Sequence, residues 1–224
     1  MDGNQSKFDS ANVEKLGNSF LEGKKVLFLG SSVTFGAASM EDGIPEYFKN
    51  RFGCIVTKEA VSGTTLVDRD EESYVSRLKK NVDTDTDYNL IICQLSTNDA
   101  AQDMPLGELG KSTDAGSFDV MTITGAIEYI IAYAKEKWDC PVMFYTGSHF
   151  DSDKYDGMVK RLYEISKKWG IHVLDLWNDE EFNNISDEER ALYMADPIHP
   201  MKAGYMKWWC PELERQLIEW RNSL

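Results

Sequence analysis

Two short segments near opposite ends of the chain carry side chains that could act together in nucleophilic catalysis. The first is FLGSSVTFG, in which Ser31 and Ser32 directly follow a short apolar run, and the second is ADPIHP, with Asp196 and His199. A serine hydroxyl becomes a nucleophile when an imidazole accepts its proton and a carboxylate orients that imidazole. Ser32, His199 and Asp196 therefore form a candidate catalytic triad. The alternatives are that the serine loop only packs, and that the second segment is only a turn before the last helix.

Two further loops carry amide groups that could stabilise a negative charge during acyl transfer. Gly63 lies in AVSGTT, and Asn98 lies in LSTND. The backbone N–H groups of Ser32 and Gly63, with the side-chain amide of Asn98, could surround the developing oxyanion. Loss of one such donor typically lowers the rate by about two to three orders of magnitude.

Asp99 and His149 stand at the edge of the same predicted site and are candidates for substrate contact. His149 lies in TGSHFDSD, where it could instead pack at the rim or join Asp151 and Asp153 in holding a metal ion. Acyl transfer by a serine needs no metal, so neither a metal ion nor a cofactor is predicted.

Short apolar runs alternate with amphipathic stretches, a pattern that predicts an α/β sandwich with about five parallel strands. Ligands bind beyond the carboxyl ends of such strands, so the polar loops after the first four strands should meet at one edge of the sheet. The longest break in the pattern, 99–119, is expected to help choose the substrate. The predicted strands are Val26–Leu29, Cys54–Val56, Leu90–Leu95, Val142–Tyr145 and His172–Leu176, and the predicted helices are 122–138, 153–169 and 201–220, with Pro211 breaking or restarting the last.

Composition favours one domain behind a short arm. The chain has 224 residues, of which 42% are hydrophobic, enough for one sizeable core. Residues 1–24 are expected to form a helical arm, and residues 25–224 a single catalytic domain. The N-terminus lacks signal-peptide features and no apolar run is long enough to cross a bilayer, so a cytoplasmic protein is predicted.

Charge and cysteine content narrow the possible partners. The net charge of −14 disfavours binding to nucleic acid or to anionic membranes. The four cysteines include no Cys-x-x-Cys pair, and they are expected to be buried and reduced. The predicted partner is therefore a small-molecule ester, while the oligomeric state is not predicted.

The four segments that carry the candidate residues resemble the four sequence blocks of the SGNH hydrolases, also called GDSL-type esterases and lipases. The resemblance implies a flavodoxin-like three-layer α/β/α sandwich and ester hydrolysis through an acyl-enzyme. It matches Ser32 to the nucleophile, because Ser31 stands where the family has the Asp of its Gly-Asp-Ser. Two other departures are Ser96, in place of the leading glycine of the third block, and Ala60-Val61, where an Asn is common before the second-block glycine.

The sequence therefore predicts a serine esterase acting on a short-chain acyl ester, with an acetylated carbohydrate as one option. One alternative is a flavodoxin-like protein whose Ser/Thr-rich loop binds a phosphate or flavin mononucleotide. Another is a protein that binds carbohydrate in the same cleft without catalysis. The first alternative gives Asp196 and His199 no role, and the presence of all three triad residues speaks against the second.

Overall fold

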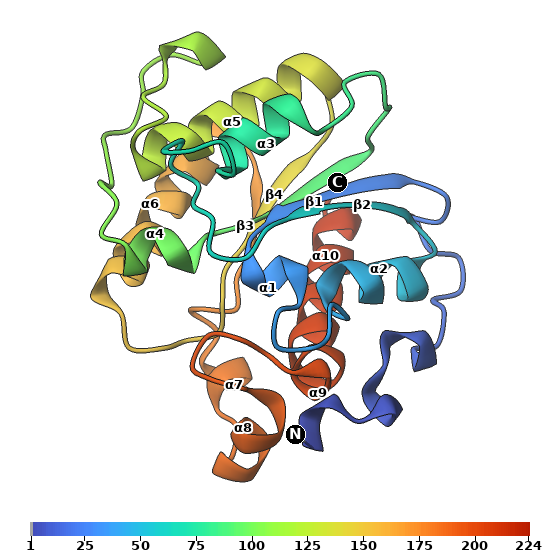
Figure 1. Ribbon diagram of the computed structural model, residues 1–224. Coiled ribbons are helices and arrows are strands. Elements are labelled where there is room, and N and C mark those ends of the chain that lie inside the picture. The colour runs from blue at the N-terminus through green and yellow to red at the C-terminus, as the bar shows by residue number, and fades with distance from the viewer. Residues whose placement is uncertain (1) are drawn as a thin grey trace.

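The computed structural model of the protein describes residues 2–224 and is a three-layer α/β/α sandwich (Figure 1). Its centre is one sheet of five parallel strands in the order β2-β1-β3-β4-β5. This arrangement confirms the predicted fold. The strands are β1 Lys25–Gly30, β2 Ile55–Ala60, β3 Leu90–Gln94, β4 Val142–Tyr145 and β5 His172–Leu174.

Helices cover both faces of the sheet because alternate strand residues point to opposite sides. On one face, Leu27 and Ile91 pack with the layer of α3, α5 and α6, whereas Phe28 and Ile92 pack on the other face with α2 and α10. The helices are α1 Ser32–Phe35, α2 Ile44–Phe52, α3 Tyr74–Lys80, α4 Thr97–Ala101, α5 Ile123–Trp138, α6 Asp153–Trp169, α7 Glu180–Asn183, α8 Asp187–Tyr193, α9 Lys202–Gly204 and α10 Cys210–Asn222.

The ends of the two long helices follow from local capping. The side chain of Thr122 accepts a hydrogen bond from Gly125 N–H at the start of α5, and Ser152 accepts one from Tyr155 N–H at the start of α6. Helix α6 ends at Gly170, which has a φ of +65°. These caps explain why the two helices lie where the sequence predicted them.

The edge strand β2 differs from its predicted range. It runs to Ala60, whereas the apolar run ended at Val56, because its later residues Thr57, Lys58 and Glu59 are polar and only half-buried. Polar residues are tolerated on an edge strand, where only one side is paired. The prediction was therefore too short at its C-terminal end.

The C-terminal segment confirms the expected interruption near Pro211. Helix α9 passes into a π-helical turn, η5 Tyr205–Trp209, and α10 then begins with Pro211 in its first turn. A proline is accommodated there because the first N–H groups of a helix need no partner within it. Trp208 and Trp209 of this segment are both buried.

The prediction of a helical N-terminal arm was wrong in form. Residues 2–12 make three short 3₁₀ turns, η1 Asp2–Asn4, η2 Ser6–Phe8 and η3 Ser10–Asn12, and an irregular segment leads to β1. Ser, Asn and Asp side chains compete with the helical hydrogen bonds and favour such turns. The segment packs on the domain: Phe8 and Leu21 are buried, and Asn4 Oδ1 accepts a hydrogen bond from Lys202 N–H.

Two further expectations concern the whole chain. All four cysteines are buried with free thiols, as predicted. Of the helices formed by residues 2–224, none combines the length and the apolar character needed to span a bilayer.

Candidate active site

The structure brings the three candidate triad residues together. Ser32 Oγ lies 2.8 Å from His199 Nε2, although 167 positions separate the two residues. On the other side of the imidazole, Asp196 Oδ2 lies 2.8 Å from His199 Nδ1. A carboxylate at Nδ1 favours the tautomer that carries its proton there, so Nε2 is free to accept the serine proton.

Asp196 is fixed by its own loop. Its Oδ1 accepts hydrogen bonds from the backbone N–H groups of Ile198, at 2.8 Å, and His199, at 2.9 Å. Burial raises the pKa of Asp196, but these two bonds and the pairing with the imidazole outweigh burial and leave the pKa below its ordinary value. The carboxylate is therefore charged at neutral pH and can hold the imidazole in place.

The nucleophile stands at the first position of α1, directly after β1. The side chain of Gln94, the last residue of β3, caps this turn: its Oε1 accepts hydrogen bonds from Ser31 N–H at 3.0 Å and from Thr34 N–H at 3.1 Å. Gly30 is required because a Cβ there would lie 1.7 Å from Thr34 Oγ1. Gln94 was not predicted from the sequence, although a glutamine within an apolar strand indicates that its side chain has a buried hydrogen-bond partner.

The three amide groups predicted to stabilise an oxyanion each keep a free N–H. The backbone N–H groups of Ser32 and Gly63 donate to no other group among residues 2–224. Asn98 Nδ2 donates to Thr64 O at 2.9 Å, which leaves one of its two hydrogens free. Gly63 has a φ of +83°, a left-handed conformation that favours glycine. These donors are the groups that sequence analysis predicted for an oxyanion hole.

Ser96, which replaces the family's glycine, takes part in the same loop contacts. Its hydroxyl accepts a hydrogen bond from Asn98 N–H at 3.2 Å and so caps α4. The same hydroxyl donates to Thr64 O at 3.4 Å. The substitution therefore adds a tie between α4 and the loop that carries Gly63.

A buried arginine joins the nucleophile's strand to the Gly63 loop. Arg77 is 2% exposed, and its Nη2 donates to Gly30 O at 2.7 Å and to Thr64 Oγ1 at 3.2 Å. Its Nη1 pairs with Glu59 Oε1 at 3.1 Å. Arg77 was not predicted from the sequence, because a basic residue on an amphipathic helix such as α3 is expected to be solvated.

The prediction that Asp99 contacts substrate was wrong. Asp99 is fully buried, and its two carboxylate oxygens accept hydrogen bonds from Leu66 N–H at 2.8 Å and Val67 N–H at 3.1 Å. Burial raises the pKa of Asp99, and the backbone hydrogen bonds oppose that rise only in part. The side chain points from α4 towards the loop after β2, so it holds this loop and has no free face for a ligand.

His149 is exposed and packs on an aromatic ring. Its ring centre lies 4.5 Å from that of Trp177, and its backbone N–H donates to Asn183 Oδ1 at 2.8 Å. Among residues 2–224, no three His, Cys, Asp or Glu side chains are placed to hold a metal ion, which leaves Asp151 and Asp153 without that role. The position of His149 fits both rim packing and substrate contact.

Residues of the His199 loop line two cavities of different size. The larger one, of about 470 Å³, is lined by His149, Phe150, Asp151, Asp187, Arg190, Ala191, Met194, Ala195, Asp196 and Pro197. The smaller one, of about 10 Å³, is lined by residues that include Val33, Leu95, Thr97 and Ile198. In the chain, Val33 follows Ser32, Thr97 precedes Asn98 and Ile198 precedes His199. Phe150 lines both cavities.

The long segment 99–119 lies away from both cavities. Lys168 Nζ donates to Gly110 O and Ser112 O, each at 2.7 Å, and Glu128 accepts a hydrogen bond from Gly110 N–H at 2.7 Å. These contacts fix the segment against α5 and α6. None of its residues lines either cavity, and its expected part in the choice of substrate stays a prediction.

The five-stranded parallel sheet, with its helices on both faces and the four sequence blocks at its carboxyl edge, defines an SGNH hydrolase. The chain belongs to the GDSL-like lipase/acylhydrolase family, whose model matches residues 28–207. This membership assigns the chain to the hydrolases that act on esters.

Solved structures share the fold at low sequence identity. A protein from Lactobacillus plantarum is 21% identical, with a TM-score of 0.71 over 90% of this chain and 98% of its own. A member of the lipolytic G-D-S-L family from Veillonella parvula is 16% identical, with a TM-score of 0.59 over 88% and 97% of the two chains. An acetyl xylan esterase is 13% identical, with a TM-score of 0.62 over 85% and 98%. No curated protein sequence matches this chain.

Proposed function

We propose that the protein is a serine esterase that removes a short acyl group from a small-molecule ester through an acyl-enzyme. The observation that carries this proposal is the contact of 2.8 Å between Ser32 Oγ and His199 Nε2, with Asp196 bound to the opposite nitrogen of the same imidazole. A hydroxyl and a base in this relation are what acyl transfer to serine requires.

The first half-reaction forms the acyl-enzyme. Ser32 Oγ attacks the ester carbonyl carbon while its proton passes to His199 Nε2. The carbonyl oxygen becomes an oxyanion, which the three amide donors stabilise. The tetrahedral intermediate then collapses: the bond to the alcohol oxygen breaks, and His199 gives its proton to that oxygen.

The second half-reaction releases the acid. Water attacks the acyl carbon and gives one proton to His199 Nε2. The bond between the acyl carbon and Ser32 Oγ then breaks, and the proton returns to the serine. Throughout both steps the carboxylate of Asp196 stays charged and stabilises the imidazolium that forms.

The small cavity beside the nucleophile supports a short acyl group. Its volume of about 10 Å³ has room for about one water-sized or methyl-sized group. Its wall contains Val33 and Ile198, which adjoin Ser32 and His199 in the chain, and on this basis we assign it to the acyl group. An acetyl group fits such a space, whereas a long acyl chain would need the wall to move.

Acetylated carbohydrate is the substrate class that we propose. The larger cavity, of about 470 Å³, gives room for a sugar on the alcohol side of the ester. One structure of the same fold is that of an acetyl xylan esterase. The combination of a small acyl cavity and a wide alcohol cavity favours this class over a long-chain lipid.

The hydrogen bonds of the serine loop count against the flavin mononucleotide alternative. The backbone N–H groups of Ser31 and Thr34, which a phosphate would need, are bound to Gln94 Oε1. A yellow purified protein would favour that alternative instead.

The proposal is tested with Ser32→Ala on p-nitrophenyl acetate and with a fluorophosphonate probe. The wild type should hydrolyse the ester and take up the probe, and the variant should do neither. Across p-nitrophenyl esters from acetate to palmitate, kcat/KM should be highest for acetate. Unchanged turnover in the variant would exclude Ser32 as the nucleophile, and a wild type that binds sugar but takes up no probe would indicate the non-catalytic alternative.

A further inference from the structure

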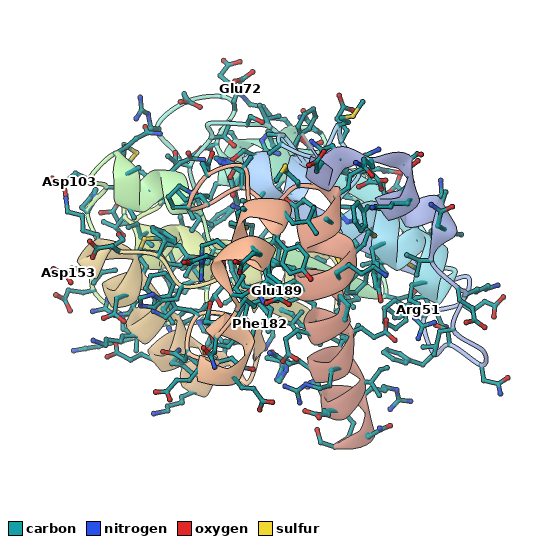
Figure 2. All side chains as sticks on the ribbon, turned by 90° about the horizontal axis from the view of Figure 1, so that it is seen from below. Arg51, Glu72, Asp103, Asp153, Phe182 and Glu189 are labelled. Carbon is teal, nitrogen blue, oxygen red and sulfur yellow. The ribbon has the colours of Figure 1, made fainter. Side chains whose placement is uncertain are left out.

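We propose that the larger cavity is a binding site for the alcohol part of the substrate, and that Arg190, Asp151 and Asp187 select a neutral, polyhydroxylated alcohol there. This inference rests on the proposed esterase function. It assigns a role to the segment that contains α7 and α8, which lies on the underside of the molecule; Phe182 of α7 and Glu189 of α8 mark it in Figure 2.

The position of the cavity follows from the direction of proton transfer. His199 must protonate the leaving alcohol, so the alcohol has to lie on the side of the triad where the His199 loop stands. The larger cavity is lined by Asp196 and Pro197 of that loop, and α8 forms its opposite wall. Phe150 lines both this cavity and the small one assigned to the acyl group, so each substituent of the ester has its own space.

The polar groups of the cavity have unused hydrogen-bonding capacity. The guanidinium of Arg190 and the carboxylates of Asp151 and Asp187 make no hydrogen bond or ion pair with any side chain or backbone group in residues 2–224. The guanidinium offers only donors, and the two carboxylates offer only acceptors. A sugar hydroxyl is both donor and acceptor, so adjacent hydroxyls can satisfy both kinds of group.

The charge of the lining favours a neutral ligand. Three carboxylates, those of Asp151, Asp187 and Asp196, and one guanidinium line the cavity. An anionic alcohol would meet an excess of negative charge, and the chain as a whole carries −14. A cationic alcohol would have to lie beside Arg190. A neutral polyol avoids both conflicts and still uses every polar group.

The rest of the lining suits a sugar ring. Met194, Ala191, Ala195 and Phe150 give the cavity an apolar floor, against which the C–H face of a pyranose can pack. The residues of α8 are well positioned, because Ser186 and Glu189 form a capping box at its start and Met194 is buried at its end. Arg190 is exposed on this helix, so its guanidinium is accessible to a ligand.

The experiment compares two acetyl esters that differ only in their alcohol. Monoacetylated xylobiose has free adjacent hydroxyls, and p-nitrophenyl acetate has none. In Arg190→Ala, KM for monoacetylated xylobiose should rise about tenfold or more, as expected for the loss of hydrogen bonds from a charged donor. Its kcat should stay within about twofold, because the interaction is equal in the ground and transition states. KM for p-nitrophenyl acetate should rise less, because its leaving group has no free hydroxyls to bond to the guanidinium.

Matched variants and ligands make the test decisive. Glu188→Ala changes an exposed residue of the same helix that does not line the cavity, and it should leave both substrates unaffected. Free xylobiose should inhibit p-nitrophenyl acetate hydrolysis by the wild type and inhibit Arg190→Ala more weakly. Equal KM values for wild type and Arg190→Ala would overturn the inference, as would a preference for acetylcholine over monoacetylated xylobiose. A wild type that does not hydrolyse p-nitrophenyl acetate would instead overturn the proposed function.

Discussion

Arg77 donates a hydrogen bond of 2.7 Å to the backbone carbonyl of Gly30, two residues before the nucleophile. The same nitrogen reaches Thr64 Oγ1 at 3.2 Å, one residue after Gly63. A single buried guanidinium thus ties β1, which leads to Ser32, to the loop that carries Gly63, the second of the proposed oxyanion donors. Preorganised donors stabilise a transition state only when they are held at the right spacing.

Arg77→Met should therefore reduce catalysis as well as stability. The free energy of unfolding should fall by about 2–4 kcal/mol, because a buried charged partner is removed and Glu59 loses its ion pair. The kcat for p-nitrophenyl acetate, measured well below the unfolding temperature, should fall about tenfold or more with little change in KM.

Lys80→Met is the matched control for Arg77→Met. Lys80 is an exposed basic residue of the same helix α3, and its ion pair with Glu71 is at the surface. Neither its stability nor its kcat should change appreciably. A loss of stability in Arg77→Met with wild-type kcat would show that Arg77 supports the fold alone.

Asn98→Ala should lower kcat by about two to three orders of magnitude, the usual effect of removing one oxyanion donor. The alanine variant also loses the bond of 2.9 Å from Nδ2 to Thr64 O, which ties α4 to the Gly63 loop. Steady-state kinetics on p-nitrophenyl acetate separate the two possible roles. A raised KM with unchanged kcat would mean that Asn98 binds the substrate and does not stabilise the transition state.

Asp196 gives a prediction about pH. Its pKa is lowered in the folded protein, so its charge stabilises the fold above the ordinary pKa of an aspartate, and this contribution is lost as the pH falls through the folded value. The difference in Tm between wild type and Asp196→Asn should be constant above about pH 5 and should shrink below about pH 4. A difference that grows as the solution becomes more acidic would contradict the lowered pKa.

The same variant tests the orientation of the imidazole. In Asp196→Asn the side chain can no longer stabilise the imidazolium, so kcat should fall by about three to four orders of magnitude. Because Asp196 keeps its charge down to acid pH, the acid limb of kcat/KM in the wild type should come from protonation of the catalytic base. A pH profile that follows the titration of Asp196 would contradict this assignment.

A residue's role could be predicted from the sequence where its neighbours in the chain determine that role. The buried strand β3 was readable because apolar residues on both faces are typical of a central parallel strand. Asp196 and His199 could be predicted as a pair, because they lie only three positions apart in one short loop.

Other roles were set by the packing of distant segments and could not be read in this way. Gln94 and Arg77 act on the turn of the nucleophile from β3 and α3, at separations of 47 to 63 positions. Asp99 adjoins Asn98 in the chain, yet the two side chains leave α4 in different directions, one towards Thr64 O and the other towards Leu66 and Val67 N–H. Successive residues of a helix do not share a face, so adjacency to a site residue did not predict the role of Asp99.

The proposed acyl cavity gives a prediction about acyl length, because Phe150 lines both this cavity and the larger one. Its ring packs 5.2 Å from the rings of both Tyr155 and Trp177. In Phe150→Ala the space left by the ring should join the small cavity to the large one, so that a butyryl group can enter. The ratio of kcat/KM for p-nitrophenyl butyrate to that for the acetate should rise about tenfold, within the range that a hydrophobic pocket gives for one or two methylenes.

Phe20→Ala is the matched control, since Phe20 lines a cavity near Leu90, at the opposite end of β3, and it should leave the ratio unchanged. A ratio that is the same in both variants would mean that the acyl group lies elsewhere.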